Sequence, residues 1–212
     1  MLRLPIIYRV VCSLILSLPC LLGGRGLAAI HDIPDNFAER TLAIVVRDRT
    51  AFITYRAGLN VKTMRNLLQK WNLPDDQYSE TLSESKLSEN FRQAAFGQLA
   101  SGLKISIDGK PLTVEKISCE PSSRHHFSLI ANYKIGLGTS SKPIDLEVTD
   151  NNFPDQQGAI RCSLKAMGKA MVLRSNAAPI IVRAKRHELE KLTPIQRKEA
   201  SSIKVKLGFS PD

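Results

Sequence analysis

Apolar residues recur at every second position in a series of short segments between residues 42 and 207. That spacing is typical of β-strands with one face in the core and the other in solvent. We predict strands at residues 42–47, 51–57, 103–108, 112–119, 126–135, 144–149, 159–164, 170–174 and 203–207. Turn-forming residues separate these segments, and the intervals are too short for helical crossovers. The pattern therefore predicts a mainly β fold, an antiparallel β-sandwich.

Between the second and third predicted strands, the apolar period lengthens to that of an amphipathic helix. The first such stretch follows Asn60, a favourable N-cap residue, and is stopped by Pro74, and the second ends at Gly102. Each has one apolar face, made of Val61, Met64, Leu67, Leu68 and Trp71 in the first and of Leu87, Phe91, Ala94, Ala95 and Leu99 in the second. We expect a two-helix insertion at about residues 60–101 that packs these faces on the core.

Residues 1–28 have the three parts of a cleavable signal peptide. Arg3 and Arg9 give a positive start, residues 10–22 form an apolar run interrupted by Pro19, and the segments 23–24 and 26–28, rich in small residues, follow. The run is shorter than the roughly 20 residues that a spanning helix needs, although an N-terminal membrane anchor is the alternative. We expect cleavage to leave a single extracytoplasmic domain, residues 29–212, that is periplasmic or secreted.

The chain is basic, with 30 Lys and Arg against 20 Asp and Glu, and only three of the Arg lie in the leader. Nucleic acid is not expected as a partner, because an exported chain rarely meets it and the cations are interleaved with Glu, as in residues 183–198. We expect a solvated basic surface in peripheral contact with an anionic membrane or wall polymer.

Two of the four cysteines, Cys12 and Cys20, lie in the predicted leader, which leaves Cys119 and Cys162 in the mature chain. A lone pair of cysteines in an oxidising compartment is most simply one disulfide, and we predict that these two are joined. The alternative is a reactive cysteine with His125 or His126 as its partner.

The sequence contains no phosphate-binding glycine loop, no nucleophile elbow and no metalloprotease motif, so no catalytic residue is assigned. Residues 150–155, DNNFPD, carry oxygen ligands that calcium could use, but they lack the spacing of a calcium loop and are also typical of a tight turn, which we favour. His125 and His126 are neighbours and would point to opposite faces of a strand, and His187 has no evident partner.

A metal site is predicted at the amino terminus that cleavage after Ala28 would create. The mature chain would begin Ala29, Ile30, His31, so that the α-amine, two backbone amides and the imidazole of His31 could form a planar set of four nitrogens. Tetragonal nitrogen ligation suits copper(II) or nickel(II). The alternative is a terminus that binds nothing, and cleavage after Ala29 would destroy the geometry.

Several short motifs resemble the extracytoplasmic N-terminal domain that precedes the membrane part of nickel/cobalt-exporter-like and sulfite-exporter-like transporters. They lie at residues 31–34, 40–47, 54–56, 102–103, 108–112, 150–155 with Gly158, and 175–179, before an Arg- and Lys-rich tail. The resemblance implies a β-sandwich with an accessory role beside metal or anion transport. Because no polytopic segment is present in these residues, transport itself is not expected.

We therefore expect a non-catalytic exported accessory or binding domain that serves metal ion handling beside a polytopic membrane transporter. Two alternatives remain open, an exported hydrolase or redox enzyme that uses scattered acids or Cys119, and a structural envelope protein.

Overall fold

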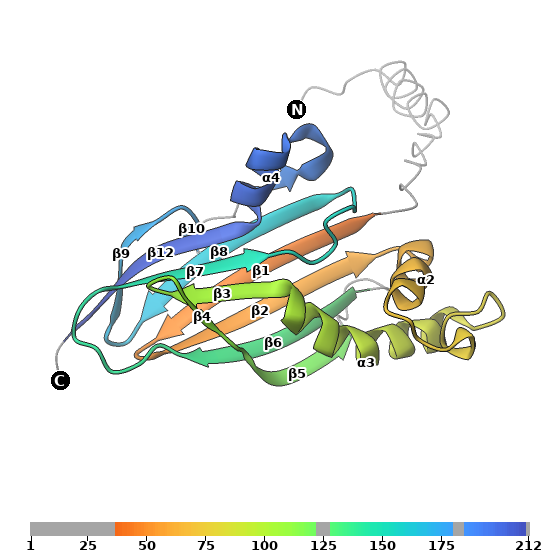
Figure 1. Ribbon diagram of the computed structural model, residues 1–212, viewed down its shortest axis with the longest axis horizontal. Coiled ribbons are helices and arrows are strands. Elements are labelled where there is room, and N and C mark those ends of the chain that lie inside the picture. The colour runs from red at the N-terminus through yellow and green to blue at the C-terminus, as the bar shows by residue number, and fades with distance from the viewer. Residues whose placement is uncertain (1–36, 122–127, 180–184, 211–212) are drawn as a thin grey trace, which may run out of the picture. The chain divides into compact units, whose positions relative to one another are not determined.

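Two β-sheets pack face to face around one hydrophobic core (Figure 1). The computed structural model describes residues 37–121, 128–179 and 185–210. Within these ranges the large sheet has the strand order β10-β8-β1-β2-β6-β5, with β11 also paired to β8, and the small sheet has the order β4-β3-β7-β12-β9. The mainly β class and the sandwich are confirmed.

The large sheet contains β1 (Ala38–Arg47), β2 (Thr50–Leu59), β5 (Glu115–Pro121), β6 (Ser128–Gly136), β8 (Ala159–Met167), β10 (Ala178–Pro179) and β11 (His187–Glu188). The small sheet contains β3 (Leu103–Ile107), β4 (Lys110–Leu112), β7 (Ile144–Asp150), β9 (Ala170–Ser175) and β12 (Ser202–Phe209). The described strand pairs are antiparallel except β1 with β8 and β10 with β8, which are parallel. Residues 112–119, predicted as one strand, divide between β4 and β5, so the chain changes sheets there.

Successive side chains of a strand point to opposite faces of the sheet, so every second residue faces the core between the two sheets. Along β1 and β2 every second residue is buried, which gives inward rows at Leu42, Ile44 and Val46 and at Ile53 and Tyr55. The small sheet supplies the facing rows, among them Leu146 and Val148 of β7 and Ile203 and Val205 of β12.

Two helices cover the part of the large sheet that the small sheet leaves open (Figure 1). Helix α2 (Val61–Lys70) begins at the N-cap Asn60 and buries Met64, Leu67 and Leu68. Helix α3 (Glu84–Gly102) buries Leu87, Phe91, Ala95 and Leu99, and Phe96 stacks on Tyr133 of β6. The two predicted amphipathic stretches thus form helices that pack on the core.

A further helix, α4 (Pro194–Ala200), lies beside β8 and β12 and was not predicted from the sequence. It starts with a capping box, because the Thr193 side chain accepts from the Gln196 backbone and the Gln196 side chain accepts from the Thr193 backbone. Its apolar face is too short to produce a helical period in the sequence. No helix in the described ranges is long and apolar enough to cross a membrane.

The predicted disulfide between Cys119 and Cys162 is contradicted, because both residues are free cysteines. They lie in one row of paired residues across the large sheet, in the order Cys119, Ala131, Tyr55, Leu42, Cys162. Four steps between strands at about 4.8 Å each separate them by about 19 Å. A disulfide needs Cα atoms within about 7 Å, so this register excludes the bond.

Candidate functional site

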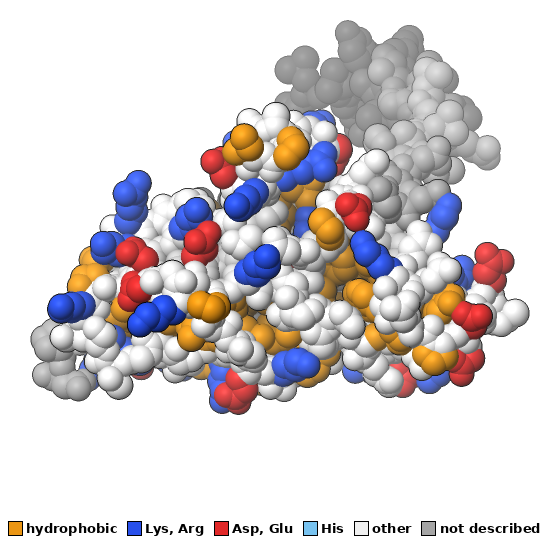
Figure 2. Space-filling view, viewed as in Figure 1, with side chains coloured by type: hydrophobic (Ala, Val, Ile, Leu, Met, Phe, Trp, Pro, Cys, Tyr) orange, Lys and Arg blue, Asp and Glu red, His pale blue; other side chains and the backbone are white. Residues whose placement is uncertain are grey.

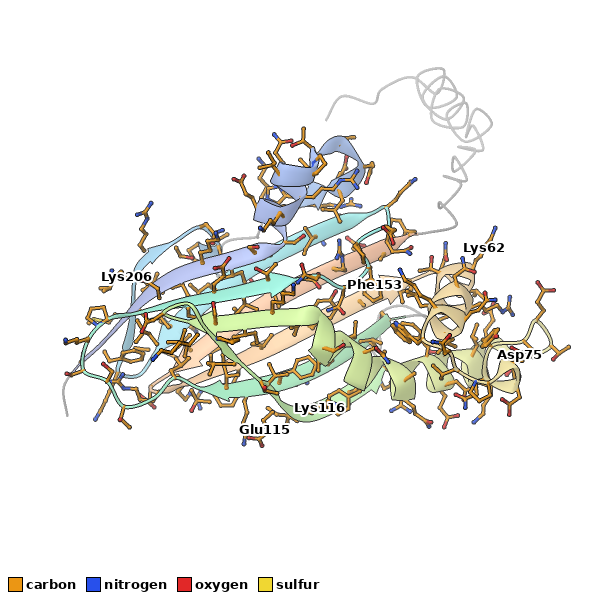
Figure 3. All side chains as sticks on the ribbon, in the orientation of Figure 1. Lys62, Asp75, Glu115, Lys116, Phe153 and Lys206 are labelled. Atoms are coloured by element: carbon orange, nitrogen blue, oxygen red, sulfur yellow. The ribbon has the colours of Figure 1, made fainter. Side chains whose placement is uncertain are left out.

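A cavity of about 290 Å³ opens between β1, the end of β7 and α4. It differs from two larger depressions, of about 650 and 700 Å³, in having buried charged groups in its wall. We call it the α4 pocket, and its lining comprises Arg40, Thr149, Asp150, Asn151, Asn152, Pro154, Leu189, Pro194, Arg197, Lys198 and Ser201. Phe153, labelled in Figure 3, marks the turn that borders it.

Arg40 is the charged residue that β1 places in the core. It occupies an inward position of the strand, two residues before Leu42, and is only 3% exposed. Its Nη1 donates to Asp150 Oδ2 at 3.0 Å and also to the backbone oxygen of Asn152. Its Nε is buried and has no hydrogen-bond partner among the described residues. The Arg40 guanidinium is therefore held by the protein through Nη1, and its Nε is, within the described ranges, an unsatisfied donor that solvent does not reach.

Asp150 is the partner of Arg40 and ends strand β7, and its carboxylate accepts two further hydrogen bonds. Tyr55 Oη donates to Oδ2 at 3.1 Å, and the Asn152 backbone N–H donates to Oδ1 at 2.9 Å. Both carboxylate oxygens are thus occupied by protein donors. The predicted turn at residues 150–155 is present, with Phe153 at φ 54° and the Gln156 N–H donating to the Phe153 oxygen at 3.2 Å.

The end of helix α3 holds this turn in place. Asn152 Nδ2 donates to the Leu99 backbone oxygen at 3.1 Å, and the Asn151 N–H donates to the Gly102 oxygen at 2.9 Å. A Cβ on Gly102 would lie 2.0 Å from Asn152 Oδ1, so only glycine permits this close approach. Helix α3 is therefore in direct contact with the segment that lines the α4 pocket.

The opposite wall comes from α4 and the start of β12. The Asp150 N–H donates to the Ser201 oxygen at 2.8 Å, and Thr149 Oγ1 lies 3.0 Å from Ser202 Oγ. Arg197 is half-buried and donates from Nε to the Leu192 oxygen at 3.1 Å, whereas Lys198 is exposed. Neither Arg197 nor Lys198 is paired with a carboxylate in the part of the chain that the structure describes.

Burial dominates the electrostatics of this cluster. It raises the pKa of Asp150, and the Arg40 guanidinium opposes that rise more strongly than any other group. Burial, reinforced by Asp150, also raises the pKa of Tyr55 well above its ordinary value. Tyr55 is therefore a neutral donor at physiological pH, and the pocket wall carries three cationic side chains against one carboxylate.

The two described cysteines are half-buried, and their thiols are bonded to backbone oxygens. Cys162 Sγ donates to the Ala200 oxygen at 3.2 Å, and Cys119 Sγ donates to the Arg92 oxygen at 3.7 Å. Burial raises the pKa of Cys119 to about 11 and that of Cys162 to about 12. Because the thiolate is the reactive form, both are weak nucleophiles near neutral pH.

The other residues singled out by the sequence are not brought to the α4 pocket. Ala29, Ile30 and His31, His125 and His126, and the predicted leader all lie outside the described residues. His187 is in β11, opposite Ile160 of β8. Among the described residues no group of three or more His, Cys, Asp or Glu side chains could hold a metal ion.

Sequence reasoning missed Arg40 and Tyr55, although a signal was present. Arg40 lies two residues before Leu42 in β1, so the alternation that buries Leu42 and Ile44 also places Arg40 on the core face. Tyr55 lies two residues after Ile53 in β2 and is placed on the core face for the same reason. A charged residue in phase with a buried row needs a partner, and Asp150, in phase with Val148 of β7, supplies it.

No family model matches the chain, and no curated protein matches it.

Proposed function

We propose that this protein is a non-catalytic exported binding domain that holds a small oxyanion-bearing ligand, a carboxylate or a phosphate, in the α4 pocket. The observation that carries the proposal is the charge of the pocket lining, in which Arg40, Arg197 and Lys198 face a single carboxylate, Asp150, among the described residues. Guanidinium groups match the planar oxygen pairs of carboxylates and phosphates better than other side chains do.

The charge of the wall supports an anionic ligand. Arg40 is paired with Asp150, but Arg197 and Lys198 lie at the rim without carboxylate partners among the described residues. An incoming anion would give these cations the counter-charge that the protein does not supply. A volume of about 290 Å³ favours a small molecule over a polymer.

Two further features support binding rather than catalysis. The thiols of Cys119 and Cys162 are protonated near neutral pH, and the carboxylate of Asp150 is occupied by Arg40, Tyr55 and a backbone N–H. No pair of nucleophile and base lines the α4 pocket. The accessory role beside a polytopic membrane transporter stays part of the proposal, and an oxyanion pocket agrees better with the anion-transport side of the resemblance than with metal handling.

The test is a thermal and calorimetric titration with inorganic phosphate and with succinate, each against sodium chloride at equal ionic strength. We expect millimolar phosphate or succinate to raise the Tm of the protein, because a ligand that binds the folded state stabilises it. Arg197→Gln/Lys198→Gln removes both rim cations without touching the buried pair, and we expect it to abolish the rise.

Lys142→Gln is the matched control, because Lys142 is an exposed lysine outside the α4 pocket. It should respond to phosphate as the unmodified protein does. An equal rise in the double variant and in the unmodified protein, or no response beyond that to chloride, would overturn the proposed function.

A further inference from the structure

Strand β9 exposes three consecutive apolar side chains at the end of the small sheet. Met171, Val172 and Leu173 are 49%, 43% and 53% exposed, and β9 pairs with β12 alone among the described strands of its sheet. Single exposed apolar residues are ordinary on a protein surface, but a contiguous run on a sheet edge marks an interaction site or an aggregation hazard.

A bulge shapes this edge. Val172 pairs with Leu207 and Arg174 pairs with Lys206, so Leu173 is an extra residue without a partner on β12. The Leu173 side chain covers Gly208, whose missing Cβ would lie 3.3 Å from Leu173 Cδ1. The bulge therefore brings an apolar side chain out of the ladder and onto the surface.

Cations border the apolar run. Arg174 follows it directly, lies opposite Lys206 in the register and has no ion-pair partner among the described residues. Lys206 is 48% exposed at its side chain and lies 3.9 Å from Asp145, at the limit of an ion pair. Figure 2 shows blue side chains next to orange ones at this end of the molecule, and Figure 3 labels Lys206 there.

A second copy of the chain fits this edge poorly. Antiparallel pairing of two β9 strands about Val172 would put Met171 opposite Leu173, but it would also bring Arg174 of each copy close to Lys169 of the other. Like charges in adjacent cross-strand positions destabilise a sheet, and a bulged strand is a weak template for strand addition.

We propose that the β9 edge, defined as residues 171–174 with Lys206, rests on an anionic lipid surface. Met171 and Leu173, which lie with Gly208 on the same face of the sheet as Arg174 and Lys206, enter the boundary between headgroups and acyl chains. Val172 borders them on the edge, and Arg174 and Lys206 pair with lipid phosphates. Apolar side chains beside cations are the combination that binds proteins peripherally to anionic bilayers. This contact is separate from the α4 pocket, because none of its residues lines that pocket.

Co-sedimentation with vesicles tests the contact. We expect the protein to bind vesicles of phosphatidylglycerol mixed with phosphatidylcholine, and to bind pure phosphatidylcholine much more weakly. Replacing Met171, Val172 and Leu173 by Ser should lower the affinity by about tenfold or more. Arg174→Gln/Lys206→Gln should lower it by about thirtyfold at low salt, with loss of the dependence on phosphatidylglycerol. These variants share every other residue, so any contribution from the leader is the same in all of them.

The controls use equally exposed residues elsewhere. Ile195→Ser removes an apolar side chain that is 74% exposed on α4, and Lys142→Gln removes a distant cation. Both should bind as the unmodified protein does, and the β9 variants should still unfold in one cooperative transition. Hydrogen exchange should show that vesicles protect the amides of residues 169–175. Binding that ignores phosphatidylglycerol, triple-Ser binding equal to that of the unmodified protein, or a vesicle-independent dimer lost in the triple-Ser variant would overturn the proposal.

Discussion

Arg40 and Asp150 are 110 residues apart in the sequence, and their 3.0 Å ion pair joins the two sheets of the sandwich. Arg40 comes from β1 of the large sheet and Asp150 from the end of β7 in the small sheet. Both side chains are at most 3% exposed, so the pair is formed at the cost of removing two charges from water. The partners of Asp150 on β2 and in the following turn offset part of that cost.

Removing one member of this pair should be far more harmful than removing both. We expect Arg40→Met to lower the free energy of unfolding by about 3–5 kcal/mol, because it leaves a buried carboxylate without its cation. Arg40→Met/Asp150→Leu should lose less than the sum of the two single variants. Urea unfolding of the four proteins measures this coupling, and strict additivity would contradict it.

The same pair predicts a change in pH dependence. Burial raises the pKa of Asp150 and Arg40 opposes the rise, so Arg40→Met should raise that pKa further. A folded-state pKa above the unfolded value of about 3.9 gives stability that is complete at low pH and is lost as the pH rises through the folded pKa. We expect Arg40→Met to regain stability relative to the unmodified protein as the pH falls from 7 towards 4.

Asp150→Asn in the Arg40→Met background is the matched control for this effect. It removes the titrating group and should remove the relative gain at low pH. A gain that persists in this double variant would assign the pH dependence to another residue.

The strands and the two-helix insertion could be predicted from the sequence, because local patterns of apolar residues determine them. Alternating apolar residues located the main strands, and the observed turn, in which Asp108 and Gly109 have positive φ, lies at the junction between the strands predicted at 103–108 and 112–119. The change of sheet between Leu112 and Glu115 could not be predicted, because both flanking segments alternate in the same way. The parallel pairing of β1 with β8 also could not be predicted, because it depends on how distant strands come together and not on a local sequence pattern.

The candidate site was less accessible to prediction for the same reason. Arg40, Tyr55 and Asp150 come from three strands and meet only when the sheets pack. The disulfide, in contrast, was predicted although it is not formed, because the number of cysteines carries no information about which strands pair. Cys119 and Cys162 share a row of the large sheet but lie on strands four steps apart.

The free thiols provide the next prediction. Residues 29–212 contain only Cys119 and Cys162, and we expect both to react with maleimide in denaturant without any reductant. In the folded protein at pH 8 both should react slowly, because burial raises their pKa to about 11 and about 12. Mass spectrometry of the labelled mature chain counts the modified thiols. Absence of labelling in denaturant would restore the disulfide.

Those pKa values also set an alkaline limit to stability. A thiol whose folded pKa is raised gives stability that is present below its unfolded pKa, 9.0 in the reference state, and is lost as the pH rises through the folded pKa. We therefore expect the free energy of unfolding to fall between about pH 9 and pH 12. Cys162→Ala should show a shallower decrease, and an unchanged slope in that variant would rule out Cys162 as a source.

Gly102→Ala should weaken the junction between α3 and the turn at residues 150–155. The added Cβ would lie 2.0 Å from Asn152 Oδ1, and Asn152 cannot move away freely because it is buried and bonded to Leu99. We expect a loss of about 1–3 kcal/mol in urea unfolding, typical of overpacking. Gly136→Ala is the control, because nothing lies within 4 Å of its added Cβ. Equal stabilities of the two variants would contradict the predicted clash.

The amino terminus carries the last prediction, which rests on the sequence alone. If export cleaves the chain after Ala28, the mature protein should begin at Ala29 and bind one copper(II) ion through its α-amine, two amides and His31. Nickel(II) should bind more weakly, since copper precedes it in the general affinity order of divalent ions. Binding should release protons and weaken as the pH falls, because the α-amine and the amides must be deprotonated.

Spectroscopic titration of the mature protein measures this site, after mass spectrometry has located the cleavage. His31→Ala should abolish binding and leave the Tm of the metal-free protein nearly unchanged, because terminal residues contribute little to stability. His125→Ala and His126→Ala are matched controls and should bind copper as the unmodified protein does. Unchanged stoichiometry in His31→Ala, or a mature chain that starts at any residue other than Ala29, would refute the site. The α4 pocket would be unaffected by that result, because its lining residues all lie after residue 39.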